Sequence, residues 1–182
     1  MRELKYHEKK LLKKVDFLNW KKDSTLRETK LMRRYYIQRR EDLKKYNKLC
    51  GIIKKIVGKL MLLKPDNDYR IKKTQELLNK FYDLGLINNK TSLKEVDEIG
   101  TAKFCRRRLA VVLCRNKYCE NIKTAITFIE QGQIQVGTKV VNNPAMLISR
   151  SMEDHISWVN TSKIKRRIDS YNGEIDDYDA LN

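Results

Sequence analysis

The chain of 182 residues is 41% apolar and 35% charged, so it holds enough apolar side chains for one sizeable core. Its 40 lysines and arginines exceed its 23 acidic residues, and the net charge of +17 favours polyanionic partners. No apolar run is long enough to cross a bilayer and the N-terminus has no secretory pattern, which argues against a membrane-spanning or secreted protein.

The first predicted elements are amphipathic helices. Residues 8–20 place their apolar side chains on one helical face. A second helix is predicted to begin near Thr25 and to run through residues 32–40. Residues 1–60 carry twenty basic and seven acidic side chains, so most of the positive charge belongs to this part of the chain. We therefore expect nucleic acid to contact the N-terminal half and the beginning of the C-terminal half.

The clearest helical periodicity lies at residues 44–60. An apolar stripe, which we expect to be used in packing, consists of Leu49, Ile52, Ile53, Ile56, Val57 and Leu60. Beside it lies a row of lysines, called the lysine row below, formed by Lys44, Lys48, Lys55 and Lys59. We interpret the lysine row, with RRYYIQRR at residues 33–40 before it, as a candidate second RNA surface. Tyr35 and Tyr36 either stack on bases or pack in the core. Binding to an acidic membrane is a weaker alternative, because the apolar stripe is better used in packing.

Pro65 and its polar neighbours break this helix. Another amphipathic helix follows and stops near Gly85, and a short helix ends near Gly100. The sequence leaves open whether the helices of residues 1–103 form a core of their own or pack beside something else.

After these helices the pattern changes. Residues 102–115 predict a helix with a core face on one side and basic residues on the other. A second helix ends at Gly132, beyond which alternating apolar residues predict a hairpin, with further strands at residues 146–148 and 155–159. We expect an α+β fold, with an N-terminal helical region followed by a small domain of two helices packed on a short twisted antiparallel sheet.

Residues 107–148 resemble the RNA-binding domain named for small-subunit ribosomal protein four. That family has an Arg-Leu start, then Ala-x-x-x-Ile-x-x-Gly, then Val-x-Val and a tight turn before a proline. The residues at these places are Arg108, Leu109, Ala125, Ile129, Gly132, Val136 and Pro144. Gly137-Thr138 stands where many members have Asn-Gly, and Ile122 stands where many have an arginine.

The similarity covers essentially the whole chain, including HEKKLLKKVDFLNW at residues 7–20 and SRSMEDHISWV at residues 149–159. The chain is similar to the members of this family found in the U3 small nucleolar ribonucleoprotein, and protein four of the mature ribosomal subunit is the nearest alternative. The HEKKLLKKVDFLNW opening and the acidic DDYDALN ending favour the nucleolar relatives. We expect a basic helical region at residues 1–103, the RNA-binding domain at 104–168 and an acidic tail at 169–182.

In this family the helix pair and the edge of the hairpin bind structured RNA. The resemblance implies phosphate contacts from the basic residues Lys103, Arg106, Arg107, Arg108, Arg115, Lys117 and Lys123. Gln131, Gln133 and Lys139 are further candidates at the corner between the second helix and the hairpin. A-form RNA presents phosphates and 2′-hydroxyls, so recognition should depend on shape more than on sequence. The alternative is that the three consecutive arginines only form the solvent-exposed face of a helix and bind no RNA.

The resemblance implies a non-catalytic RNA-binding component of the small-subunit processome in the nucleolus. Such a protein helps U3 small nucleolar RNA (snoRNA) pair with precursor ribosomal RNA during 18S rRNA maturation and binds a large nucleolar scaffold protein. A polycation lowers the repulsion between two RNA strands, which suits this role. A permanent ribosomal protein, an RNA-modifying enzyme and a plain protein–protein scaffold are the alternatives.

The cysteines, the histidine and the Gly-Thr-Lys turn that could serve metal binding or catalysis do not match the motifs for those functions. Without disulfide-scaffold or Cys-x-x-Cys spacing, we expect reduced thiols at Cys50, Cys105, Cys114 and Cys119. His155, with Asp154 and Ser151, forms no nucleophile motif. Gly137–Lys139 lacks the upstream glycine of a phosphate-binding loop. We therefore expect no metal site, no cofactor and no small-molecule substrate.

Overall fold

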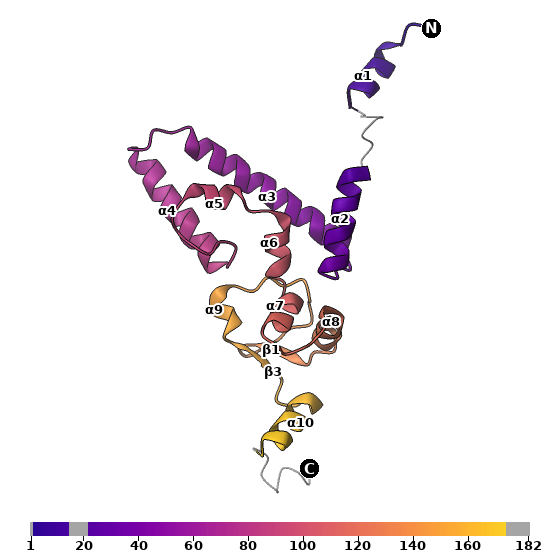
Figure 1. The fold of residues 1–182 in the computed structure, drawn as a ribbon, viewed down its shortest axis with the longest axis vertical. Helices are drawn as coiled ribbons and strands as arrows, with labels where there is room; N and C mark the ends of the chain where they lie inside the picture. The colour runs from indigo at the N-terminus through magenta and orange to yellow at the C-terminus, as the bar shows by residue number, and fades with distance from the viewer. Residues whose placement is uncertain (1, 15–21, 174–182) are drawn as a thin grey trace.

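The computed structural model describes residues 2–14 and 22–173 of the chain (Figure 1). These residues form helices along most of their length and one small antiparallel sheet near the C-terminal end. The predicted α+β class is confirmed. Within the described ranges, no helix is both long and apolar enough to span a membrane. Residues 15–20 of the first predicted helix and residues 174–182 of the predicted acidic tail lie outside the described residues.

The N-terminal half is helical. Its described helices are α1 (Tyr6–Lys14), α2 (Lys22–Arg34), α3 (Arg40–Met61), α4 (Asp68–Asp83), α5 (Leu93–Asp97) and α6 (Thr101–Arg106). The long helix α3 packs against α2, α5 and α6. Figure 1 shows α4 returning beside α3, with α5 between them. The start of α4 is fixed by Asn67, whose side chain accepts a hydrogen bond of 2.9 Å from the Tyr69 N–H.

Helix α3 is covered along one side only. Its buried residues are Leu43, Tyr46, Cys50, Ile53, Val57 and Leu60. They belong to a core that runs from Tyr35 to Cys105, so the N-terminal half has a core of its own. The predicted apolar stripe is therefore only partly used in packing. Leu49, Ile52 and Ile56 are 42%, 44% and 41% exposed, because they lie on an edge of α3 that the other described helices leave open.

The second predicted helix is shorter than expected. Helix α2 ends at Arg34 and does not continue to residue 40, because Tyr36 takes a left-handed backbone conformation with φ of 47°. The turn separates the two tyrosines. Tyr35 is buried in the N-terminal core, whereas Tyr36 is 41% exposed. Packing is therefore the role of Tyr35.

The C-terminal half contains two packed helices, a small sheet and two further helices. Its elements are α7 (Leu109–Arg115), α8 (Ile122–Glu130), β1 (Ile134–Val136), β2 (Lys139–Val140), α9 (Arg150–Glu153), β3 (Ile156–Trp158) and α10 (Lys163–Asn172). Helix α7 packs on α8, and the antiparallel sheet has the order β2-β1-β3, with Gln135 opposite both Val140 and Ser157. A second core begins at Leu109 and ends at Ile156.

One predicted strand does not join the sheet. Residues 146–148 instead pair with the segment between α6 and α7. The Ile148 N–H donates to the Arg107 carbonyl at 2.9 Å, and Leu147 forms an isolated antiparallel β-bridge with Arg108. The strand predicted at residues 155–159 is confirmed as β3. The loop at residues 146–148 thus connects the second core to the junction between the two halves.

Gly132 forms the corner between α8 and the hairpin. Its φ of 70° ends the helix, and its N–H donates to the Ile129 carbonyl at 2.9 Å. A Cβ atom at this position would lie 3.3 Å from the Asn142 side-chain oxygen and 3.6 Å from Val140. The glycine therefore allows the helix end, the hairpin and the following loop to approach one another.

Candidate nucleic-acid interface

The three consecutive arginines do not lie on one helix. The helix predicted at residues 102–115 is interrupted between α6 and α7, and Arg108 has extended backbone angles. Arg107 and Arg108 thereby turn into the protein, where they are only 5% and 2% exposed. Arg106 stays exposed at the end of α6, and its Nε donates to the Tyr35 hydroxyl at 3.3 Å.

Arg107 connects the junction to α9. Its Nε donates to the Ile148 carbonyl at 2.8 Å and its Nη1 pairs with Glu153 at 3.1 Å. Burial, with a further contribution from the positive charge of Arg150, lowers the pKa of Arg107. Gly85 leaves room for this side chain, because a Cβ there would lie 2.7 Å from the guanidinium carbon. A buried cation requires such partners to offset the loss of its hydration.

Arg108 connects the two halves of the protein directly. Its Nη1 pairs with Asp42 of α3 at 3.2 Å and contacts the Tyr46 hydroxyl at 3.4 Å. The Tyr46 hydroxyl also donates to the Ala145 carbonyl at 3.5 Å, so the contact reaches the loop before residue 146. The ring of Tyr46 stacks on Phe104 with centroids 5.8 Å apart.

Two of the ten expected contact residues are poorly placed to reach RNA in this structure. Arg107 and Arg108 were expected to bind phosphates, but each is buried and paired within the chain. Arg108 joins α3 to the C-terminal domain, and Arg107 joins the segment between α6 and α7 to α9. We therefore leave them out of the RNA surface proposed below. Lys103, which is half-buried on α6, remains with Arg106 at the edge of this junction.

Three predicted contact residues gather at one end of the helix pair. Arg115 ends α7, Lys117 lies in the turn, and Lys123 stands in the first turn of α8; all three are exposed. Lys117 has a left-handed φ of 62°, which reverses the chain between the packed helices. Arg115 also pairs with Glu153, and partial burial followed by the positive charges of Arg107 and Arg150 lowers its pKa.

The other predicted residues lie at the opposite end of α8. Gln131 and Lys139 are exposed beside the Gly132 corner. Gln133 is half-buried, and its side-chain oxygen accepts a hydrogen bond from the Ser162 hydroxyl, which caps α10. The Gln133 side chain is thus engaged in holding the start of α10.

The structure adds a polar cavity that the sequence did not indicate. It has a volume of about 500 Å³ and lies between the start of α3, the end of α8 and residues 142–145. Its exposed cations are Arg39 and Lys45, and the Gln38 amide donates to Glu130 across it at 3.0 Å. Lys45 comes close to the domain only through the fold, whereas Arg39 belongs to the basic run RRYYIQRR at residues 33–40, which was expected to extend the lysine row.

A second missed group lies on α10, beyond the segment that resembles the family pattern. This helix carries four basic residues, Lys163, Lys165, Arg166 and Arg167. The run KIKRR was a usable signal, because clustered basic residues are typical of nucleic-acid surfaces. The lysine row on α3 is exposed along its whole length, as an RNA surface requires.

The thiols are placed as structural residues. Cys50, Cys105 and Cys119 are buried, and none of the four cysteines forms a disulfide. Burial raises the pKa of the Cys105 and Cys119 thiols from 9.0 to about 11, so both are protonated at neutral pH. Across the described part of the chain, no group of three or more histidine, cysteine or acidic side chains is arranged to hold a metal ion.

Comparison with known proteins assigns the family. The model of the ribosomal protein S4/S9 N-terminal domain matches residues 3–110, and the S4 domain matches residues 107–154. The chain is 47% identical to the U3 small nucleolar ribonucleoprotein protein IMP3 of Saccharomyces cerevisiae and 44% identical to that of Homo sapiens, in each case over 98% of both chains. The chain belongs to the IMP3 branch of the ribosomal protein S4 family.

A more distant relative separates this branch from the ribosomal proteins. The small ribosomal subunit protein uS4 of Hyperthermus butylicus is 26% identical over 81% of this chain and 83% of its own. The two family matches overlap at residues 107–110, where Arg107 and Arg108 are buried between the two cores. The first core ends at Cys105 and the second begins at Leu109.

Proposed function

We propose that the chain is a non-catalytic RNA-binding component of the U3 small nucleolar ribonucleoprotein that acts in the small-subunit processome. The observation that carries this proposal is its 47% identity, over 98% of both chains, to a protein named for that particle. The particle's name also supports a nucleolar location. A plain protein–protein scaffold is less well supported, because it does not require a net charge of +17.

The proposed RNA surface consists of the exposed residues around the helix pair and the hairpin. Its main contacts are Lys103, Arg106, Arg115, Lys117, Lys123, Gln131 and Lys139, with Gln133 at its edge. The polar cavity beside Arg39 and Lys45 extends this surface toward α3. On α3, the lysine row is a second RNA surface.

The finer proposed role is to help U3 snoRNA pair with precursor ribosomal RNA during 18S rRNA maturation. Pairing brings two phosphate backbones together, and a protein with two cationic surfaces lowers their repulsion. We also propose a large nucleolar scaffold protein as a partner. The exposed apolar edge of α3, formed by Leu49, Ile52 and Ile56, supports a protein contact at this helix.

The experiment that tests the particle is fractionation of cell extracts with antibodies against the chain. The proposal predicts co-purification with U3 snoRNA and precursor ribosomal RNA in nucleolar particles. Recovery mainly from mature polysomes would support the alternative, a structural protein of the small ribosomal subunit, which the 26% identity to uS4 proteins keeps as a candidate. Turnover of ribosomal RNA by the purified chain would contradict the non-catalytic role.

A further inference from the structure

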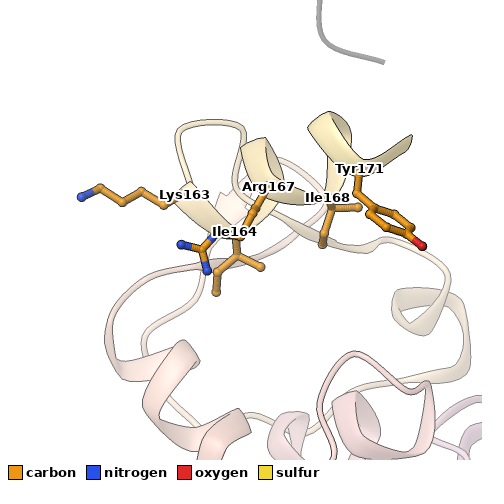
Figure 2. A pocket seen from close by; sticks show the side chains of 5 residues that line it. All are labelled: Lys163, Ile164, Arg167, Ile168 and Tyr171. Carbon is orange, nitrogen blue, oxygen red and sulfur yellow. The ribbon is translucent and has the colours of Figure 1, made fainter. Parts of the chain in front are cut away.

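The described residues leave most of the apolar side of helix α10 exposed. Ile164, Ile168 and Tyr171 are spaced four and three residues apart, so they lie on one helical face. Ile164 is half-buried, Ile168 is 39% exposed and Tyr171 is 93% exposed. Figure 2 shows the three side chains projecting from the same side of α10 toward the rest of the domain. Such a face is unusual on an isolated surface helix and indicates a docking site.

The domain surface opposite this face is aromatic. The ring centroid of Trp158 lies 5.6 Å from that of Phe128 and 5.9 Å from that of Tyr118. Together with Ile164 and Ile168 these rings line a cavity of about 390 Å³. Ile164 also lines two neighbouring cavities of about 500 Å³ and 540 Å³. The three cavities share Ile164 and together form a groove along α10 with apolar residues at its floor and polar residues beside them, called the α10 groove below.

The rim of the α10 groove is positively charged. Lys117, Lys163 and Arg167 line its cavities, and Lys165 and Arg166 stand on the same helix. The described rim residues of these cavities include no acidic side chain. An apolar floor between cations fits a segment that alternates apolar and acidic residues.

The chain itself contains such a segment. Residues 174–182 follow α10 directly and read EIDDYDALN, with apolar residues at every third position: Ile175, Tyr178 and Leu181. Three acidic residues, Asp176, Asp177 and Asp179, stand between them, Glu174 precedes them, and the segment has no basic residue. Gly173 ends α10 with a left-handed φ of 72°, as is typical where the chain leaves a helix. A ten-residue helix is about 15 Å long, whereas nine residues in a polyproline II conformation, which puts every third side chain on one side, reach about 28 Å, so the segment is long enough to return along α10.

We propose that residues 174–182 bind in the α10 groove. Ile175, Tyr178 and Leu181 contact the aromatic floor, and the carboxylates between them pair with the rim cations. The segment thereby covers the apolar face of α10 and neutralises part of its positive charge. RNA phosphates then compete with the segment for α10, so the groove couples RNA binding at this helix to release of the segment.

Trp158 reports occupancy of the groove. The chain has two tryptophans, and Trp20→Phe leaves Trp158 as the sole tryptophan, which is excited selectively at wavelengths beyond the absorption of the tyrosines. In this background, removal of residues 174–182 is expected to raise quenching of Trp158 by acrylamide and to shift its emission to longer wavelength. Replacement of Ile175, Tyr178 and Leu181 by serine is expected to have the same effect. Ala180→Ser is the matched control in the same segment and is expected to leave quenching unchanged.

Two further comparisons decide the occupant. Replacement of Asp176, Asp177 and Asp179 by asparagine removes only the charge pairing. It is therefore expected to raise quenching of Trp158 less than the replacement of the three apolar residues by serine does. Equal quenching in the full-length and shortened chains would overturn the proposal. So would protection of Trp158 by poly-uridine RNA, or by a nucleolar protein fraction, to the same extent in both chains, because the groove then belongs to that ligand. The proposal does not depend on the processome role, which the fractionation experiment tests separately.

Discussion

Replacement of Arg108 by methionine tests whether this arginine is structural. Arg108 is 2% exposed, and its partner Asp42 has a side chain that is 15% exposed. Removing one member of a buried ion pair costs about 3–5 kcal/mol, because the other charge stays buried without its partner. The partial exposure of Asp42 places the expected loss near the lower end, about 3 kcal/mol. For a chain of this size that corresponds to a melting temperature lowered by roughly 6–12 °C.

The assay is urea or thermal unfolding combined with RNA binding at a temperature where the variant is folded. Arg108→Met is expected to lose stability but to keep its RNA affinity. The double variant with Asp42→Asn is expected to lose less than the sum of the two single changes, because the pair interacts directly. Arg106→Met, the exposed neighbour, is the control and is expected to change stability by less than about 0.5 kcal/mol. An Arg108→Met protein of unchanged stability and reduced RNA affinity would refute the structural role.

Two further predictions concern the junction and the thiols. Gly85→Ala is expected to destabilise the protein by about 1–3 kcal/mol, because φ is +70° and the added Cβ meets the Arg107 guanidinium. The control is Gly58→Ala, which lies in open space on α3 and is expected to stabilise the protein by about 0.5–1 kcal/mol. Equal changes in the free energy of unfolding in urea for the two variants would contradict this reasoning. Since burial raises the pKa of Cys105 and Cys119 from 9.0 to about 11, their contribution to stability is full below pH 9 and is lost as the pH rises through about 11. Unfolding of wild type and of Cys105→Ala/Cys119→Ala from pH 8 to 11 checks this, and parallel curves would count against it.

Much of the C-terminal domain was predictable because its signals are local. The steps of three and four residues that end at Ile129 mark a helix, and Gly132 followed by alternating Ile134 and Val136 marks the turn into a strand. A local signal also explains why the strand predicted at residues 155–159 is confirmed as β3. Packing within this domain joins residues that are close in sequence, so the pattern and the structure agree.

The site was harder to predict because its arginines are positioned by distant residues. Arg108 is buried by Asp42 and Tyr46, which lie 66 and 62 positions earlier in the chain. A run of three arginines has the same composition whether it faces solvent or the interior. Likewise, the exposure of Ile52 follows from which helices pack on α3, and periodicity does not carry that information.

The salt dependence of RNA affinity tests the central claim most directly. The purified chain and a structured RNA are titrated across a range of salt concentrations. With about six phosphates neutralised, the logarithm of affinity is expected to fall against the logarithm of salt with a slope of roughly −4 to −5. Combined replacement of Arg106, Lys117 and Lys123 by glutamine is expected to make the slope shallower by about 2–3. A slope near zero, or one that these three replacements leave unchanged, would contradict the claim that the exposed cations bind the RNA backbone.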